Sequence, residues 1–550
     1  MPRDVHQRIT ANAENLRVNA VSYKPAWSVL CLSLPTVVPL LVVLGSWFNP
    51  QPEVWAHLNE FVLPAVLKNT MLMAFGVAAM VSVLGVGLAW LTAVCEFPGR
   101  RWFAWALVLP LALPGYVLAS VMVGLFDYSG PLQTLLRSTL GPVSVAPIRS
   151  MGGAIVVFGL VLYPYVYLLA RQAFLTQGKR SLEAAQTLGM PRWLAFFKVA
   201  LPMSRPWWAA GITLALMEML ADFGTVAIFN VDTFTTAIYK AWLALFNLPV
   251  ASQLASLLAL AVLLLVWFEQ RAIAQRRFAA NAVDARLERL QLAGVSRWMA
   301  CAACAAVLLF AFVIPLIQLM VWALAVVQHD WDDRYWQFIG HSLMLSSLSA
   351  LIVVAIGLWL AYAQRQHPDV ITRLFVRTST LGYALPGILL SVGLFIPVAW
   401  LDQRLYPLWQ SWGIDPAPVL KGTLLIMLLA ISARFLAVGF EPMQAAMQRI
   451  TLSQQQAAHS LGLSRWGVLH KLYLPLLRSG WLGASLLVFV EVMKEMPITL
   501  MTRPFGWDTL AVRVYEMSAE GMWDRAALPS LCIVLVGLMP VLLLVRQSEH

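Results

Sequence analysis

Long apolar runs separated by short charged segments are the dominant pattern along this chain. A run of about 20 apolar residues can cross a bilayer as a helix, because the hydrocarbon core offers no water to an open backbone. The pattern therefore predicts an all-α polytopic membrane protein with about twelve transmembrane helices. The predicted spans lie near residues 26–48, 66–94, 104–126, 152–175, 207–230, 251–270, 298–327, 341–363, 378–400, 421–440, 480–501 and 527–545.

The composition agrees with this pattern. Apolar residues make up 60% of the 550 positions, charged residues only 12%, and the mean hydropathy is +0.74. Soluble domains carry about twice that charged fraction. Lys and Arg exceed Asp and Glu by 38 − 27 = 11, but the basic residues lie in short loops between spans. There they orient the chain, so we expect contact with membrane lipid and no nucleic-acid partner.

The distribution of basic residues predicts the topology. With the N-terminus inside, the inner segments hold 25 Lys and Arg residues and the outer segments about ten. The inner set includes Arg100, Arg101 and the segments 179–205 and 271–297. The positive-inside rule therefore places both termini in the cytoplasm.

The two halves of the chain repeat each other at an offset of 272 to 273 residues. The matching landmarks are Leu113-Pro114-Gly115 with Leu385-Pro386-Gly387, Gly189 with Gly462, Leu201-Pro202 with Leu474-Pro475, Glu218 with Glu491, and Asp222 with Glu495. Six spans in each half make the repeats parallel. We therefore divide the chain into a cytoplasmic N-terminal segment (1–25), a first half (26–270), a cytoplasmic linker (271–297) and a second half (298–550).

A short motif occurs once in each half, between the fourth and fifth spans. In the first copy, three residues separate Glu183-Ala184-Ala185 from Gly189, and Pro202 follows after nine residues and a Val-x-Leu. The second copy has the same spacing and contains Gln456, Ala457, Ala458, Gly462 and Pro475. Alanines favour a helix and allow a partner to approach closely, while glycine and proline end the helix. One copy would fit an ordinary cytosolic loop helix, but two copies at a constant offset favour a docking element.

This motif resembles the EAA loop of ABC importer permeases. In that family the loop forms a cytoplasmic coupling helix that sits in a groove of the ATPase subunit. The resemblance implies a type I permease fold, a bacterial inner-membrane location, two ABC ATPase subunits and a periplasmic substrate-binding protein. Gln456 replaces the usual glutamate, and Val199 and Leu472 stand where isoleucine is usual, so the two ATPases could dock unequally.

The chain has no motif of its own for ATP chemistry. It lacks a GxxxxGK[ST] loop, and no nucleophile–base set or metal cluster accompanies its five cysteines. We therefore expect no catalytic residue and no directly bound cofactor, with ATP hydrolysed in the partner subunits.

Several peptides resemble the iron(III) permeases of bacterial ABC importers. They are residues 221–225 (Ala-Asp-Phe-Gly-Thr), 233–239 (Thr-Phe-Thr-Thr-Ala-Ile-Tyr), 494–500 (Lys-Glu-Met-Pro-Ile-Thr-Leu) and 503–510 (Arg-Pro-Phe-Gly-Trp-Asp-Thr-Leu). This resemblance extends over the whole chain, including its fused halves, and implies iron(III) as the substrate.

Acidic residues inside two equivalent spans, together with Lys494 beside one acidic pair, are candidates for the translocation path. Glu218 and Asp222 are four residues apart, as are Glu491 and Glu495, so each pair shares one helix face. Ionisable groups in a membrane are costly and usually face a cavity or a partner. Carboxylate oxygens suit hard cations, so Glu218 and Glu491 are candidate transient ligands of iron(III). The alternative is that these acids are structural and neutralised by Lys494.

Other transport functions remain open on the sequence. An ABC permease for thiamine, a polyamine or a phosphonate would share the paired loops. A secondary transporter can also have two parallel six-span halves, although an ion-coupled carrier needs no ATPase docking site.

Overall fold

The computed structural model describes residues 24–141, 147–279, 289–412, 419–421 and 423–548, and these ranges are almost entirely helical. The strands in them are β1 (Cys95–Glu96) and β2 (Leu290–Gln291), which pair in parallel. Through this pair, the end of the segment that joins the halves lies against the end of α4 (Leu63–Val94). Residues 271–279 of the predicted linker continue α14 (Leu248–Ala279), and residues 280–288 lie outside the described ranges.

The first half contains six long helical stretches and several short ones. In chain order its remaining elements are α2 (Lys24–Gly45), η1 (Ser46–Phe48), α3 (Pro52–His57), η2 (Leu58–Val62), α5 (Arg100–Ala106), η3 (Leu109–Ala112), α6 (Gly115–Phe126), α7 (Pro131–Leu140), α8 (Met151–Thr187), α9 (Arg192–Ala195), η4 (Phe196–Ala200), α10 (Leu201–Met203), α11 (Arg205–Ala221), α12 (Gly224–Ile228), α13 (Phe234–Tyr239) and η5 (Lys240–Ala244).

The second half follows the same order. Its elements are α15 (Val295–Leu308), η6 (Leu309–Val313), α16 (Ile314–Asp330), α17 (Asp333–Gln366), α18 (Val370–Thr380), η7 (Leu381–Ala384), α19 (Gly387–Ser411), α20 (Leu425–Gln448), α21 (Leu452–Ser460), α22 (Arg465–Val468), η8 (Leu469–Tyr473), α23 (Leu474–Leu476), α24 (Arg478–Met493), α25 (Pro497–Thr502), α26 (Leu510–Ala519) and α27 (Trp523–Ser548).

Within the described ranges, nine helices are long and apolar enough to cross a membrane, and the number rises to eleven if each of two bent pairs is one span. These eleven match eleven of the twelve predicted spans. The remaining prediction, 207–230, corresponds to α11, which has only 17 residues and stops at Ala221. The fold class predicted from the sequence is thus confirmed, while four of its spans, 104–126, 207–230, 378–400 and 480–501, are not continuous helices.

The interruptions occur at the repeated Leu-Pro-Gly motif and at the acidic residues. The chain bends by 91° between Arg100–Ala112 and Gly115–Leu140. Leu113 is extended there because the residue before a proline is forced out of the helical region. Predicted span 480–501 also breaks, since α24 ends at Met493 and α25 begins at Pro497. Hydropathy did not predict these breaks because the sequence on both sides of each break is apolar. Each break leaves backbone groups outside a helix within a predicted span.

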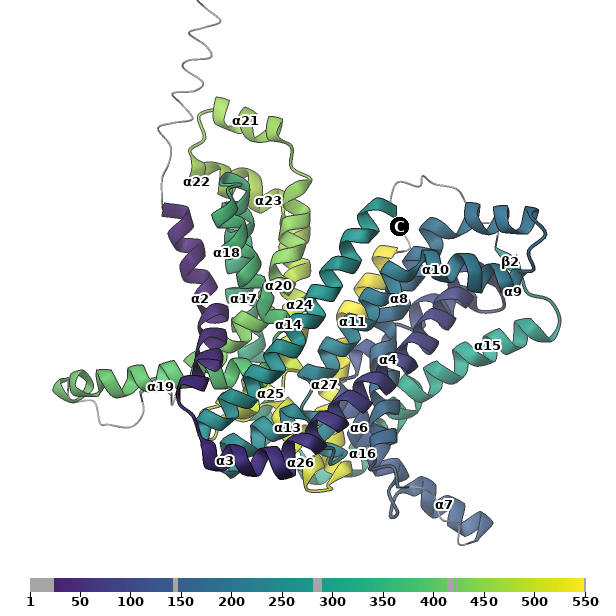
Figure 1. The fold of residues 1–550 in the computed structure, drawn as a ribbon, viewed down its shortest axis with the longest axis horizontal. Coiled ribbons are helices and arrows are strands. Elements are labelled where there is room, and N and C mark those ends of the chain that lie inside the picture. The colour runs from purple at the N-terminus through teal and green to yellow at the C-terminus, as the bar shows by residue number, and fades with distance from the viewer. Residues whose placement is uncertain (1–23, 142–146, 280–288, 413–418, 422, 549–550) are drawn as a thin grey trace, which may run out of the picture.

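The first helix of each half packs on the other half. Helix α2 lies against α18, α19 and α20 of the second half, and α15 with η6 and α16 lies against α5, α6 and α8 of the first. Figure 1 shows α2 beside α17 and α18, and α15 on the opposite side of the molecule. Thr36 on α2 donates to the Ser379 carbonyl at 3.1 Å, and Ser28 accepts from Trp359 at 3.0 Å. The halves are therefore interlocked.

Many large apolar side chains face outward. Met71, Leu72 and Phe75 on α4 and Leu324 on α16 are each at least half exposed. On a soluble protein such a surface would be an aggregation hazard. Here it is the surface that lipid covers, since hydrocarbon solvates these groups as well as a protein core does.

Candidate functional site

A cavity of about 120 Å³ lies between the two halves. Its lining includes the ends of α11 and α24, both Leu-Pro-Gly loops or the segments beside them, and parts of α8 and α20. All five residues that the sequence suggested for a translocation path line this one cavity: Glu218, Asp222, Glu491, Lys494 and Glu495. The repeat thus places its two acidic pairs at a common centre, and their role in transport stays a prediction.

Two of the four acids have the same structural task. The Asp222 carboxylate accepts from the Thr225 backbone N–H at 2.7 Å and from the Thr225 hydroxyl at 3.0 Å, which caps α12. The Glu495 carboxylate accepts from the Ile498 N–H at 2.9 Å, which caps α25. A carboxylate in this position satisfies N–H groups that the first helical turn leaves unpaired. For these two acids the structural alternative therefore has direct support.

The glycines of the repeated Leu-Pro-Gly loops touch these caps. A Cβ atom at Gly115 would lie 2.7 Å from the Thr225 hydroxyl oxygen, and one at Gly387 would lie 2.8 Å from Cγ1 of Ile498 and 3.0 Å from a Glu495 oxygen. Such contacts are too short for any side chain. Glycine is required at both positions because each loop packs directly on a capped helix.

The second half supplies the cavity's cations. Arg434 on α20 forms an ion pair with Glu495 at 3.5 Å and donates to the Leu385 carbonyl at 3.0 Å. The Lys494 ammonium contacts the Glu491 carboxylate at 2.8 Å. Both acids of the second half are therefore neutralised by cations of the same half.

The first half has no equivalent cations. At the repeat offset of 273 residues, Lys494 corresponds to Ala221 and Arg434 to Val161, and both of these apolar residues also line the cavity. Among the described residues, the Glu218 side chain makes no hydrogen bond or ion pair. Glu218 is half-buried and faces the cavity. Within the described ranges Asp222 also contacts no cation, but Thr225 hydrogen-bonds to it, so Glu218 is the one acid of the four with neither a hydrogen-bond partner nor a cation in contact.

Four polar lining residues escaped the sequence-based list: Tyr116 on α6, Tyr165 on α8, Tyr383 on η7 and Arg434. Arg434 had a usable signal, because an arginine inside a predicted span implies a buried partner or a cavity. The tyrosines had none, because a tyrosine in an apolar run is ordinary in a membrane helix.

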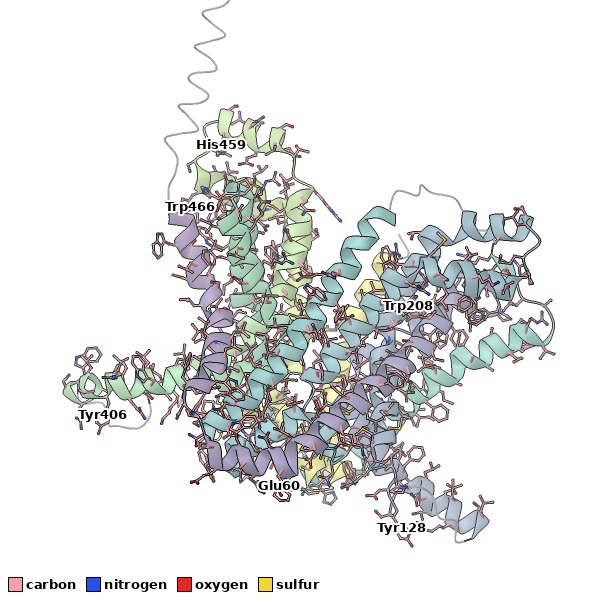
Figure 2. All side chains as sticks on the ribbon, viewed as in Figure 1. Glu60, Tyr128, Trp208, Tyr406, His459 and Trp466 are labelled. Carbon is pink, nitrogen blue, oxygen red and sulfur yellow. The ribbon has the colours of Figure 1, made fainter. Side chains whose placement is uncertain are left out.

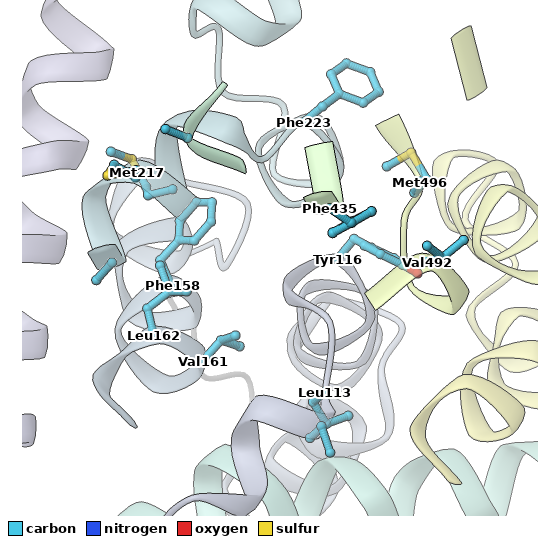
Figure 3. Close-up of a cluster of buried hydrophobic side chains, with 14 of the residues drawn as sticks. Leu113, Tyr116, Phe158, Val161, Leu162, Met217, Phe223, Phe435, Val492 and Met496 are labelled. Atoms are coloured by element: carbon cyan, nitrogen blue, oxygen red, sulfur yellow. The ribbon is translucent and has the colours of Figure 1, made fainter. Parts of the chain in front are cut away.

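The rest of the wall is apolar. Figure 3 shows Leu113, Phe158, Val161 and Leu162 from the first half near Phe435 of the second, and all five line the cavity. An apolar wall excludes water and strengthens the field of the charged groups inside it.

No group of three or more His, Cys, Asp or Glu residues in the described ranges is placed to hold a metal ion. The four acids are near enough for Glu218 and Glu491 to act electrostatically on Glu495, and Glu218 on Asp222. They do not converge on a single point. The hypothesis that Glu218 and Glu491 contact iron(III) transiently thus needs further oxygen ligands.

The two predicted ATPase-coupling loops have matching ends. The Met190 N–H donates to the Ala185 carbonyl at 3.0 Å, and the Leu463 N–H donates to the Ala458 carbonyl at 3.2 Å. Gly189 and Gly462 have φ of 78° and 81°, a left-handed conformation that favours glycine. In both loops the glycine therefore ends a helix, as its position in the motif predicted.

The beginnings of the loops differ. The first belongs to the long helix α8, and the side chains of Glu183 and Ala184 lie outside the described residues. The second is a separate helix, α21, whose cap Thr451 is reinforced by Gln454. Gln456 and Ala457 are exposed on α21, and Ala458 is buried. Pro202 and Pro475 are each the second residue of a short helix, α10 and α23, that directly follows a π-helical turn.

Both loops lie at one end of the molecule. Figure 1 shows α21 and α22 at the same end as α9 and α10, where α2 also begins and α27 ends. Figure 2 places His459 and Trp466 at this end, and Glu60 and Tyr128 at the opposite one. This arrangement agrees with the predicted topology, in which the loops and both termini share one side.

The sequence profile described as binding-protein-dependent transport system inner membrane component matches this chain twice, at residues 83–321 and 353–549. The Fe(3+)-transport system permease protein FbpB 2 of Haemophilus influenzae is 24% identical over 528 residues, which are 94% of this chain and 97% of that protein. The sulfate transport system permease protein CysT of Escherichia coli is 29% identical over 244 residues, 44% of this chain and 85% of its own length. The putative 2-aminoethylphosphonate transport system permease protein PhnV of Salmonella typhimurium is 31% identical over 216 residues, 39% of this chain and 74% of its own.

Proposed function

Since this chain belongs to the family of binding-protein-dependent transport system inner membrane components, we propose that it is the permease through which an ATP-driven importer moves iron(III) across the inner membrane. Membership makes it a fused, two-repeat ABC permease, a multi-pass membrane protein that works with ATPase and binding-protein partners. The choice of iron(III) is the part that rests on further argument.

The charge of the cavity carries this choice. Four carboxylates and two cations line it, which gives a formal charge of −4 + 2 = −2. Charges in a water-poor cavity interact far more strongly than in bulk water. An acidic lining lowers the energy of a cation there and raises that of an anion such as sulfate, molybdate or a phosphonate.

The similarities to known proteins support the same choice. The iron(III) permease of H. influenzae matches 94% of this chain, so it shares the fused layout. The sulfate and 2-aminoethylphosphonate permeases match less than half of this chain each. Fusion alone does not identify the substrate, but the full-length match and the acidic cavity agree.

The size of the cavity favours a small solute. A water molecule occupies about 30 Å³ in the liquid, so 120 Å³ holds an ion with a few waters. Pockets for drug-sized ligands measure about 300–1,000 Å³. Thiamine, or iron wrapped in a large chelator, would need a wider passage than this conformation offers.

We also propose that each glycine-ended loop receives one ATPase subunit, so that one copy of this chain assembles with two ATPases. The support is the duplication of the loop, its matching C-terminal caps and the location of both copies at one end (Figure 1). This end would face the cytoplasm, together with both termini. A native mass measurement that finds two copies of the permease in one complex would contradict this stoichiometry.

The substrate is tested with the complete complex. The permease, its ATPases and its binding protein are reconstituted in vesicles, and ATP-dependent uptake of iron(III) is compared with uptake of sulfate, 2-aminoethylphosphonate and thiamine. We expect iron(III) uptake that requires ATP and the binding protein. Uptake of an anion or of thiamine without iron(III) uptake would refute the proposal, and transport without ATPases would indicate a secondary transporter.

A further inference from the structure

Two tyrosines, one from each half, meet in the cavity. Tyr165 lies on α8 and Tyr383 on η7, directly before the second Leu-Pro-Gly loop. Both are half-buried and face the same cavity. Each phenol carries one proton and acceptor lone pairs, so both side chains can present oxygen to the cavity.

The uncompensated carboxylate of Glu218 lies beside this pair. It is close enough to act electrostatically on both Tyr165 and Tyr383. The neighbouring acids Glu491 and Glu495 are held by Lys494 and Arg434. Asp222 also has no described cation within 4 Å, but Thr225 hydrogen-bonds to it. The third lining phenol, Tyr116, donates to the Lys494 carbonyl at 3.3 Å. Among the described lining residues, Glu218, Tyr165 and Tyr383 are thus the oxygen-bearing side chains that no cation contacts and no close hydrogen bond engages.

We propose that Glu218, Tyr165 and Tyr383 form a transient binding site for a hard trivalent cation, which on the proposed function of this chain is iron(III) in transit. The site deepens that function by naming the atoms that contact the ion: one carboxylate group and two phenol oxygens.

Charge balance favours a trivalent ion. When both phenols ligate, each gives its proton to a hydroxide ligand carried by the hydrolysed ion, the hydroxide leaves as water, and the ligands become one carboxylate and two phenolates with a total charge of −3. A bound Fe³⁺ then forms a neutral unit. A neutral complex avoids the cost of an uncompensated charge in an apolar surrounding, whereas a divalent ion would leave one negative charge.

The ligand chemistry points the same way. Carboxylate and phenolate oxygens are hard donors, which suit iron(III) better than thiolates or imidazoles do. They also supply the oxygens that the acids alone lack, because the described acids do not converge on one point.

Three protein ligands also allow the ion to leave. An octahedral ion held by three protein oxygens keeps water in its other positions. Conduction requires binding that is strong enough for entry and weak enough for exit, and reprotonation of a phenol loosens the site. The different halves that carry Tyr165 and Tyr383 would separate these ligands whenever the halves move apart.

The test uses the purified complex and two probe ions. Iron(III) buffered by nitrilotriacetate is added, and visible absorption is recorded, because iron(III) bound to phenolate gives a ligand-to-metal charge-transfer band. Gallium(III) has the same charge and a similar size but a filled d shell, so it should compete for the site and abolish the band without producing one.

Three variants remove the proposed ligands, and one serves as a matched control. Tyr165→Phe and Tyr383→Phe should each weaken the band and lower gallium(III) affinity by at least about tenfold, as loss of a ligand does in metal sites. Glu218→Gln should lower affinity similarly but leave the band position unchanged. The control is Tyr163→Phe, two residues away on α8, whose hydroxyl donates to the Leu107 carbonyl at 2.7 Å outside the cavity lining. It should behave as wild type.

The outcomes separate this site from the general function. If the wild-type complex transports iron(III) but shows no band, and both Tyr→Phe variants transport at the wild-type rate, the phenol site is refuted and the iron(III) function stands. If the wild-type complex transports an anion instead, the function fails, whatever the absorption shows. A variant that no longer co-purifies with its ATPases is replaced by the Tyr165→Phe and Tyr383→Phe double variant of the detergent-solubilised permease, in which persistence of the band would also refute the site.

Discussion

The two halves of this permease present the same acids to the cavity but treat them differently. Asp222 and Glu495 each cap a short helix behind a Leu-Pro-Gly loop, and this arrangement is the same in both halves. Glu491 is paired with Lys494, while its counterpart Glu218 faces the cavity without a cation because Ala221 stands where the lysine would be.

This difference suggests two roles for the residues around the cavity. The contacts of Asp222 and Glu495, which are present in both halves, hold the broken spans together. A feature that the halves do not share changes the charge and chemistry of the cavity. The unshared residues are Arg434 and Lys494 of the second half, whose first-half counterparts are apolar, together with Tyr383 of the second half and Tyr165 of the first. We expect substrate preference to follow these unshared positions.

The largest effect should come from Arg434. Arg434→Met leaves the buried Glu495 carboxylate and the Leu385 carbonyl without their partner, and breaking a buried ion pair costs about 3–5 kcal/mol. Thermal unfolding in detergent should show a much lower melting temperature. Adding Glu495→Gln should restore a large part of the loss, and an Arg434→Met protein as stable as wild type would show that the pair does not hold the fold.

The next prediction makes the first half resemble the second. Ala221→Lys places an ammonium near Glu218, and a unit charge about 4 Å away contributes about 4 kcal/mol at an effective dielectric constant of about 20. Iron(III) uptake should fall at least about tenfold while the complex still assembles. The reverse change, Lys494→Ala, makes the cavity more acidic and should not reduce cation entry; if both variants transport equally, the charge asymmetry has no role.

A third prediction compares the equivalent glutamates. Glu218→Gln removes a charge with no described partner, so it should reduce iron(III) uptake about tenfold without lowering the melting temperature. Glu491→Gln leaves the Lys494 ammonium without its partner, and an unsatisfied, partly buried polar group costs about 1–3 kcal/mol. Uptake and melting temperature are measured on both variants. Equal transport by wild type and Glu218→Gln would assign this acid a structural role.

The smallest effects should be equal in both halves. Gly189→Ala and Gly462→Ala force a side chain into a left-handed conformation, at a cost of about 1–2 kcal/mol, although a Cβ atom meets nothing within 4 Å at either position. Each variant should weaken binding of the ATPase, measured with the purified subunit, and Gln456→Glu should change it by a few tenths of a kcal/mol. Normal ATPase binding by both glycine variants would argue against these loops as docking elements.

Apolar patterning and the repeat offset were sufficient to predict the helical membrane fold and its two similar halves. They were sufficient because a bilayer imposes length and apolarity on every span, and these properties are local. The motif spacing also predicted that Gly189 and Gly462 end helices, since a left-handed C-terminal cap is a local property too.

The cavity was a different matter. The acids could be placed on one helix face from their spacing, and Lys494 could be named as a partner because it lies three residues from Glu491. Arg434 on α20 and the tyrosines on α8 and η7 are distant in the sequence from the acids they approach. Continuous hydropathy could not reveal that the spans break at Leu113 and after Ala221, because a broken helix and an intact one have the same composition.

The sequence by itself therefore determined which segments cross the membrane, how the chain repeats and which residues carry charge. Only the tertiary structure decided that Arg434 neutralises Glu495, that Glu218 keeps its charge uncompensated, and that Tyr165 and Tyr383 meet beside it. The physical reason is the distance along the chain over which each effect acts. Burial in lipid and helix capping depend on residues that are neighbours in the sequence. The charge of a cavity depends on groups that the packing of the two halves brings within a few ångströms of each other.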